Sequence, residues 1–492
     1  MKNTFFATIF ILVTHFIQSQ TQDLSKMANG YLDSNFIIYD SNEQVYGYIY
    51  FYNQGSVDKD HIQFEYVLLD KNLNKLSNNI FTTKKYLNRF VRYITNCTLV
   101  NNDELLINLK HHDTFFISFA LFSFRKISIS KNIVSPEYYY IDEQIKVIPD
   151  NLEEYKKSLN PVSKAGVSLA KASTNGYYIL EHNYNNFHFY KTKFIKFYNT
   201  DNQLVWNYTY NPIATRQNYI TASIIHNTSD NLYIVESNSE GLTKLDCKIV
   251  TLDQKTGDKK YEYLLEKDVR QFNHTKNLKE LNNQLIIFGN YSNYKKGTYF
   301  DLEKNLGFYK IVLDSTGKEI SKKYVVWEDF NNKIKITANG RFKKNLRIRT
   351  LKFFVFNDGR ICILTELVNK KQNQISDFVL FFMDKDFNLI KTEIIQKGIS
   401  YYNDSDGYMF SQYTKNGKEA VFFYTRFSSN ERKWILGVNT ISDNELKKET
   451  IPIYSEEDKY IIYPMKAKEG YIILREYNEN DKYNQIRLEK LN

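Results

Sequence analysis

The chain has 492 residues and a net charge of +10, which is the small difference between 66 basic and 56 acidic residues. Charges of both signs are interspersed without a long basic run, which indicates a solvated surface and argues against nucleic acid as a partner. Aromatic residues make up 16% of the chain, with 40 Tyr and 35 Phe against 6 Pro and 5 Met. Such side chains favour a pleated, half-buried surface, so the composition predicts β-structure.

Residues 1–19 have the pattern of a cleaved signal peptide. Lys2 supplies a positive charge, residues 5–13 form an apolar core, and Ser19 is a small residue before a polar stretch. This core is much shorter than the roughly 20 residues that a membrane-spanning helix needs. No later segment is long and apolar enough to span a membrane, so we predict a secreted or periplasmic protein without a membrane span.

A pattern of strand, polar turn and strand recurs along the chain about every 60 residues, as in repeat architectures. The turn begins with Asp or Asn, at Asp70, Asn199, Asp253, Asp314, Asp384 and Asn439. A degenerate copy is expected at 119–129, and a last strand in the same phase lies at 485–491. Short apolar runs precede these strands at 46–53, 104–109, 176–183, 231–238, 284–291, 360–367, 419–426 and 470–477.

Repeats of this length with about four antiparallel strands each predict an all-β β-propeller. One blade cannot bury both of its faces alone, and a continuous apolar run fits a strand that is covered on both faces. The copies favour eight blades, while seven stays open because those at 91–140 and 459–492 are irregular. We expect a single domain over 24–492, with 36–40 as the missing outer strand of the last blade. The alternative is two β domains.

Two further segments depart from the repeat. Residues 146–166 break the strand pattern and are interpreted as an insertion between blades, with a short helix before Pro161 and a possible division between two domains. Residues 341–349 are strongly basic, and their alternation is typical of an edge strand protected by charge. If this stretch binds a ligand, the predicted secretion favours an anionic glycan or envelope component over nucleic acid.

The sequence predicts no metal or other cofactor. Cys97, Cys247 and Cys362 are odd in number and far apart, which indicates buried thiols rather than a zinc cluster, although a disulfide pair stays open. A calcium loop starting at Asp384 requires Gly at its sixth position and Glu at its twelfth, where this chain has leucine and isoleucine. Asp384 is therefore interpreted as the first residue of a tight hairpin turn.

The candidate ligand-binding residues are four glutamates that follow the apolar runs, together with one histidine: Glu181, Glu236, Glu366, Glu476 and His182. If the strand ends converge, the carboxylates can bind a cation, an amine or a sugar hydroxyl. The alternative is that each glutamate ends a buried strand at water or pairs with a Lys or Arg of the next blade, as Arg426 and Arg475 at similar places suggest. His182 beside Glu181 has the residue types for acid–base chemistry, but no separate nucleophile accompanies them.

The turn at 314–318, with the sequence DSTGK, and the apolar strand before it resemble the outer turns of repeat β-propellers from secreted bacterial proteins. This resemblance covers most of residues 30–492 and implies the fold, without any catalytic residue. Nucleophile-elbow, phosphate-loop and zinc-protease motifs are absent from the sequence. We therefore predict a binding or scaffold module for protein or glycan without catalysis. The alternative is a propeller-type polysaccharide hydrolase or lyase.

Overall fold

The computed structural model describes most of the chain after the predicted signal peptide. The described residues are 20–40, 43–84, 90–113, 120–141, 144–149, 154, 170–181, 193–211, 218–240, 244–265, 270–273, 277–293, 305–331, 334–342, 346–369, 374–401, 407–428, 433–453, 461–478 and 483–491. Strands dominate these ranges, and none of their helices is long and apolar enough to cross a membrane. The predicted helix before Pro161 and nearly all of the predicted insertion after residue 149 lie outside the described residues.

The chain divides into two compact units. Unit 1 consists of Met1–Lys84 and Tyr454–Asn492, and unit 2 consists of Lys85–Ile453. The described residues form eight antiparallel sheets, two in unit 1 and six in unit 2, each built on an up-and-down meander. The fold is therefore an eight-bladed β-propeller, as predicted. The single domain over 24–492 stays a prediction.

Unit 1 contains blades 1 and 8, which come from the two ends of the chain. Blade 1 consists of β2 (Tyr31–Tyr39), β3 (Val45–Ser56), β4 (His61–Asp70) and β5 (Lys75–Lys84). Blade 8 consists of β35 (Ile461–Lys466), β36 (Tyr471–Asn478), β37 (Tyr483–Lys490) and β1 (Gln20–Asp23). The short 3₁₀-helix η1 (Leu24–Lys26) connects β1 to blade 1.

Unit 2 contains blades 2 to 7. Blade 2 consists of β6 (Phe90–Leu99), β7 (Glu104–Asp113), β8 (Ala120–Ser128), β9 (Ile133–Val134), β10 (Tyr138–Ile141) and β11 (Gln144–Val147). Blade 3 consists of β12 (Lys171–Ser173), β13 (Gly176–Leu180), β14 (Lys193–Asn199) and β15 (Leu204–Asn211). Blade 4 consists of β16 (Asn218–Asn227), β17 (Asn231–Glu240), β18 (Lys244–Asp253) and β19 (Lys259–Leu264).

Blades 5 and 6 carry additional short elements. Blade 5 consists of β20 (Arg270–Asn273), β21 (Leu278–Leu281), β22 (Gln284–Asn293), β23 (Asn305–Leu313) and β24 (Glu319–Val326), followed by η3 (Trp327–Phe330). Blade 6 consists of β25 (Arg341–Phe342), β26 (Leu346–Val355), β27 (Ile361–Asn369), β28 (Gln374–Met383), β29 (Leu389–Ile395) and β30 (Ser400–Tyr401). Blade 7 consists of β31 (Gly407–Thr414), β32 (Glu419–Ser428), β33 (Lys433–Ser442) and β34 (Glu445–Ile453).

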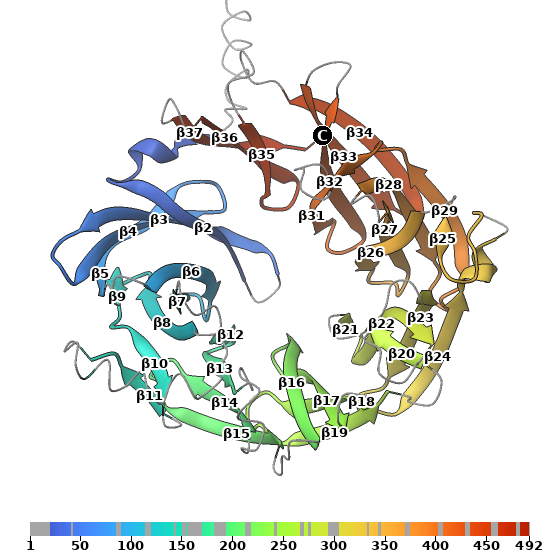
Figure 1. Cartoon of the computed structure of the whole chain (residues 1–492), viewed down its shortest axis with the longest axis horizontal. Coiled ribbons are helices and arrows are strands. Elements are labelled where there is room, and N and C mark those ends of the chain that lie inside the picture. Colours follow the sequence, from blue (N-terminus) through green and yellow to red (C-terminus); the bar gives the residue numbers. More distant parts are fainter. Residues whose placement is uncertain are drawn as a thin grey trace, which may run out of the picture. The chain divides into compact units, whose positions relative to one another are not determined.

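In counting strands we leave out the two-residue β25 and take β20 with β21, which both pair with β22, as the first strand of blade 5. Within unit 2 the first strands of the blades, such as β16, β26 and β31, then lie on the concave side, and the fourth strands lie on the outer side (Figure 1). The apolar run of each copy is the second strand of its blade, as the repeat predicted. In β27 every residue is buried, because alternate side chains face opposite neighbours. Ile361 and Ile363 pack against blade 5, whereas Cys362 and Leu364 pack against blade 7.

Strand β1 completes the last blade. It pairs antiparallel with β37, from Gln20 opposite Leu488 to Asp23 opposite Gln485. The prediction that residues 36–40 supply this strand is wrong, because Phe36–Tyr39 belong to β2, the first strand of blade 1. The actual strand is a polar four-residue segment, and it lacks the apolar pattern by which a strand is found in a sequence.

The turn at Asp384 is a hairpin, as predicted. The Asp384 carboxylate accepts bonds from the backbone N–H of Asn388 at 2.7 Å and from its side chain at 2.8 Å. Phe387 in this turn has a φ of 61° and is buried, and Leu73 has the corresponding place in blade 1 with a φ of 68°. The predicted turn at Asn439 is wrong, because Asn439 is buried inside β33 and the turn follows it at residues 443–444.

Candidate functional site

Each blade has two different ends. Because its strands are antiparallel, the connection between the second and third strands leaves at the same end as the connection to the next blade. We call this the loop end, and the opposite end the turn end. In unit 2 the longest connections within a blade, at 181–192 and 294–304, belong to loop ends, whereas the turn at 314–318 is typical of the turn ends. The four predicted glutamates lie near the loop ends of second strands.

Glu181 and Glu236 are buried between consecutive blades. The Tyr140 hydroxyl of blade 2 donates to Glu181 Oε1 at 2.5 Å, and Lys196 Nζ lies 4.0 Å from the same oxygen. The Tyr208 hydroxyl of blade 3 donates to Glu236 Oε1 at 2.7 Å. Each carboxylate therefore accepts a hydrogen bond from a tyrosine on the preceding blade and lies near a lysine on its own blade.

Lys248 is the cationic partner of Glu236. It is the direct cross-strand neighbour on β18, with its Nζ 3.3 Å from Glu236 Oε2 and 3.2 Å from Glu262 Oε2. Burial lowers the Lys248 pKa, but the two carboxylates outweigh that effect and raise it. Burial and the Glu236 charge also raise the pKa of Tyr208, which therefore stays protonated and donates its hydrogen bond. Both oxygens of the Glu236 carboxylate are thus in contact with polar groups, one from blade 3 and one from its own blade.

Glu366 and Glu476 have arginine partners instead. Arg349 is the direct cross-strand neighbour of Glu366 and donates from Nη2 to Glu366 Oε2. The Glu366 side chain is 2% exposed and that of Arg349 is 32% exposed, so the carboxylate is removed from water and the guanidinium is only partly covered. In unit 1, Arg487 Nη1 lies 2.7 Å from Glu476 Oε1 in a more exposed pair. All four glutamates thus have a basic neighbour on an adjacent strand of the same blade, not on the next blade.

Strand alternation separates the glutamates of unit 2 into two sets. Glu236 follows Leu232 by four positions and shares its face, which packs against blade 3. Glu366 follows Ile361 by five positions and lies on the opposite face, toward blade 7. Leu232 and Ile361 have equivalent places, because each pairs with the last residue before the outer turn. The apolar runs place the glutamates at similar positions in the repeat, but they do not reveal this shift of one residue between Glu236 and Glu366.

The remaining candidate residues are His182 and the three cysteines. His182 lies outside the described residues. Cys97, Cys247 and Cys362 are free and buried, and burial raises the thiol pKa of Cys97 and Cys362. Among the described side chains, no group of three or more His, Cys, Asp or Glu residues is placed to hold a metal ion.

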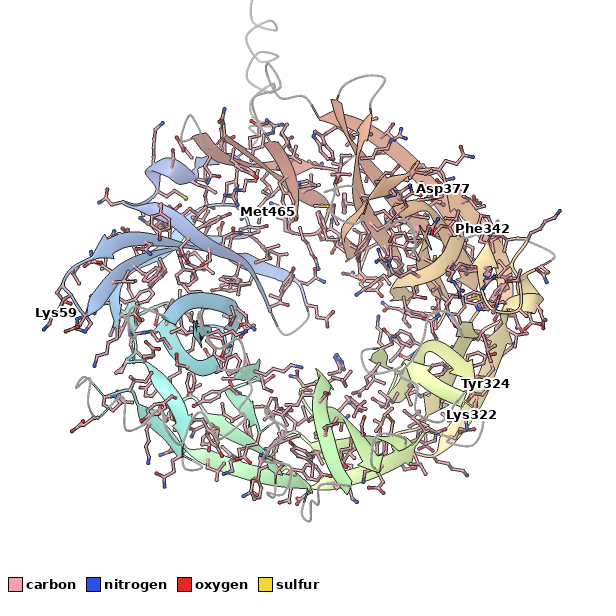
Figure 2. The ribbon with its side chains drawn as sticks, in the orientation of Figure 1. Lys59, Lys322, Tyr324, Phe342, Asp377 and Met465 are labelled. Atoms are coloured by element: carbon pink, nitrogen blue, oxygen red, sulfur yellow. The ribbon has the colours of Figure 1, made fainter. Side chains whose placement is uncertain are left out.

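A second polar cluster lies between blades 6 and 7. Asp377 (Figure 2) accepts hydrogen bonds from the backbone N–H groups of Lys397 at 3.1 Å and Gly398 at 3.2 Å. The buried Lys397 donates from Nζ to Ser400 Oγ at 3.0 Å, and its carbonyl accepts a long bond of 3.4 Å from Arg426. These contacts fix the short loop after β29, in which Ile399 is 70% exposed.

The exposed aromatic side chains have a distribution that the sequence did not reveal. Among the described residues they are Tyr31, Tyr39 and Tyr463, which are 61%, 38% and 46% exposed. All three lie on the first strands of unit 1, β2 and β35. The described first strands of unit 2 expose no large apolar side chain, and the exposed ones of that unit are aliphatic residues on outer or additional strands and on one loop. Tyr is spread evenly along the sequence, so its spacing gave no signal.

The eight meander sheets define a β-propeller protein, and the four glutamates lie beside basic residues of their own sheets. The chain belongs to a family of unknown function, DUF6770, which matches residues 1–381. No curated protein matches the chain.

Three solved structures are similar to this chain at low identity. The β-propeller domain of the Trilobed protease from Pyrococcus furiosus is 9% identical, with 82% of this chain and 95% of that chain covered and a TM-score of 0.37. A europium-containing methanol dehydrogenase is 10% identical, with coverage of 96% and 94% and a TM-score of 0.40. Sqt1 from Chaetomium thermophilum is 8% identical, with coverage of 96% and 99% and a TM-score of 0.39. Similarity at this level says nothing about activity.

Proposed function

We propose that this protein is a secreted or periplasmic binding or scaffold module for a protein or glycan. The observation that carries the proposal is the pairing of the second-strand glutamates. Glu236 and Glu366 are 2% and 1% exposed and each is bound to a basic residue on the adjacent strand. Carboxylates in such pairs hold sheets and blades together, whereas a glycosidase needs two carboxyl groups facing one substrate.

The outer surface supports a role in which the blades act as a rigid frame. Lys322 and Tyr324 (Figure 2) lie on β24, which is the fourth strand of blade 5. Lys322 pairs with Glu319 at 3.0 Å, and Glu319 accepts a bond of 2.5 Å from Tyr263 of blade 4. Lys323 of the same strand bonds Asn388 of blade 6. Outer strands of consecutive blades are thus linked, and their edges are protected by lysine.

The proposal is tested with the full-length protein, produced with its N-terminal segment and recovered from the cell fraction into which it is exported. Binding to immobilised polysaccharides and to surface-exposed proteins is measured beside the release of reducing ends or unsaturated sugars. We expect binding without turnover, and we expect Glu236→Gln to keep that binding. Turnover of a polysaccharide that is abolished by Glu236→Gln or Glu366→Gln would overturn the proposal, as would recovery of the unprocessed chain from the cytoplasm.

A further inference from the structure

In unit 1, side chains of β35 and β36 contact side chains of β2, and exposed tyrosines and planar polar side chains belong to these strands. Tyr463 on β35 is the direct cross-strand neighbour of Arg475 on β36, so the two side chains share a face. Met465 (Figure 2), on that same face, packs into the core that blades 1 and 8 share. The face that carries Tyr463 is therefore directed toward blade 1.

Arg475 is the centre of this group. Its guanidinium carbon lies 5.3 Å from the centre of the Tyr477 ring, and its Nε donates to Asn484 Oδ1 at 2.9 Å. Its Nη1 reaches Asn35 Oδ1 of blade 1 at 3.4 Å, which is a long contact. The guanidinium thus lies over the ring of Tyr477 and contacts the amide oxygens of Asn484 and Asn35.

The group continues along β2. Tyr39 lies four residues beyond Asn35 on the same face of the strand, and Lys466 Nζ of β35 lies 4.8 Å from the centre of its ring. Four residues of a strand span about 13 Å. Tyr463, the cross-strand neighbour of Arg475, and Tyr39, beside Lys466, are the two exposed rings of this group. We call this the tyrosine strip, consisting of Asn35, Tyr39, Tyr463, Lys466, Arg475 and Tyr477.

Beneath the tyrosine strip, Tyr50 is fully buried on β3, and its hydroxyl has no hydrogen-bond partner among the described residues. Burial raises the Tyr50 pKa, so the hydroxyl keeps its proton, and the nearby charge of Arg475 opposes that rise without cancelling it. A buried hydroxyl without a partner is uncommon in a native protein, and an ordered water or a ligand group satisfies it in most cases. Tyr50 is the cross-strand neighbour of Asn35, so this hydroxyl belongs to the buried layer under the tyrosine strip.

We propose that the tyrosine strip binds a glycan chain, which rests on the proposed function and specifies its ligand and its place. Tyrosine rings offer flat apolar faces with a polar edge, and these stack on the C–H face of a pyranose. The guanidinium and the two asparagine amides supply donors and acceptors for ring hydroxyls. Arg475 and Lys466 add positive charge, whereas Glu476, on the opposite face of β36, is already paired with Arg487.

The charge predicts which glycans bind best. A uronate carries a carboxylate that a guanidinium recognises with two parallel hydrogen bonds, so acidic chains bind more tightly than neutral ones. A protein partner is less well matched, because a stable protein interface buries a desolvated core of apolar residues. The first strands of unit 1 expose tyrosines and no aliphatic side chain among their described residues.

The test uses the full-length protein with an oligogalacturonate and a neutral cello-oligosaccharide of equal length, titrated by calorimetry. We expect the oligogalacturonate to bind more tightly. Tyr463→Ala is expected to weaken binding roughly three- to tenfold, as the loss of one stacking aromatic does. Tyr463→Phe keeps the ring and is expected to bind nearly as the parent does. Arg475→Lys is expected to weaken the uronate more than the neutral chain.

Tyr31→Ala is the matched control. Tyr31 lies on β2, as Tyr39 does, and is more exposed, but its hydroxyl accepts a bond from Asn53 of its own blade. Its binding should equal that of the parent. Binding of neither probe, or binding unchanged in a Tyr39→Ala/Tyr463→Ala double variant that melts like the parent, would overturn the inference. If the protein then binds a protein partner, the proposed function still stands. Glycan turnover that depends on Tyr463 would instead support the strip and overturn the non-catalytic role.

Discussion

Units 1 and 2 are built from the same kind of blade but differ in how the chain forms them and in the side chains that they expose. Unit 2 is one continuous stretch of chain, its exposed apolar residues are aliphatic side chains away from the first strands, and its second-strand glutamates are buried in ion pairs. Unit 1 is assembled from both ends of the chain and exposes tyrosines on its first strands. Unit 2 can therefore form its sheets from one stretch of chain. Unit 1 needs both ends of the chain to complete blade 8, and it carries the tyrosine strip that we propose as a glycan site.

The largest difference is expected from removal of the closing segment, residues 20–24. Leu24 is fully buried in the core of unit 1, and its carbonyl accepts a hydrogen bond of 2.8 Å from Tyr52. Leu24→Ala alone is expected to cost about 2–5 kcal/mol of stability, as large-to-small core substitutions do. Deletion of 20–24 also removes the pairing with β37, and it should raise hydrogen exchange in unit 1 while unit 2 keeps its protection.

Exchange measured by mass spectrometry locates the effect, with Thr21→Ala as a control because Thr21 is exposed on β1. If the deletion increases exchange equally throughout unit 2, the two units are not independent in stability and the comparison fails.

The ion pairs offer the next largest contrast. Arg349→Ala leaves the carboxylate of Glu366, whose side chain is 2% exposed, without its partner and is expected to cost about 3 kcal/mol. Arg487→Ala is expected to cost at most about 1 kcal/mol, because the Glu476 side chain is 16% exposed and water replaces part of the lost contact. Urea unfolding of the two variants gives both values. Equal losses would show that burial does not distinguish these pairs.

The hairpin turns predict that a glycine variant is more stable than an alanine variant at two buried positions, the reverse of the usual order. Phe387 is buried but has a left-handed backbone conformation, which costs an ordinary residue roughly 1–2 kcal/mol. Phe387→Gly and Phe387→Ala both lose the ring, but only glycine relieves the backbone. The glycine variant should therefore be about 1 kcal/mol more stable than the alanine variant, and Leu73 in unit 1 should give the same order. Thermal melting compares each pair, and a more stable alanine variant would contradict the left-handed assignment.

The smallest effect is a dependence of stability on pH. Burial raises the pKa of Asp384, but hydrogen bonds from Asn388 and the Lys323 charge outweigh it and lower the pKa overall. A carboxyl group with a lowered folded-state pKa stabilises the protein above its ordinary pKa of about 4, and this stabilisation is lost as the pH falls through the folded value. Asp384→Asn should therefore flatten the loss of stability between about pH 5 and pH 2. An unchanged acid profile in this variant would exclude the contribution.

The sequence was sufficient for the blades and insufficient for the site. Each continuous apolar run marked a second strand, because burial on both faces leaves a pattern that does not depend on neighbours far along the chain. The closing strand could not be found in this way, because β1 is polar and its pairing depends on β37 at the other end of the chain. The glutamates were found, but a one-residue shift between Glu236 and Glu366 decides which face each occupies. The tyrosine strip depends on exposure, which the spacing of tyrosines does not encode.

The pairing of β1 with β37 has a consequence for synthesis of the chain. One of the first strands to leave the ribosome must wait for one of the last before blade 8 can form, whereas blades 2 to 7 can assemble in order as they emerge. The nascent protein therefore carries an unpaired N-terminal segment throughout elongation. A chain that stalls before residue 483 lacks β37, so its strand β1 has no partner.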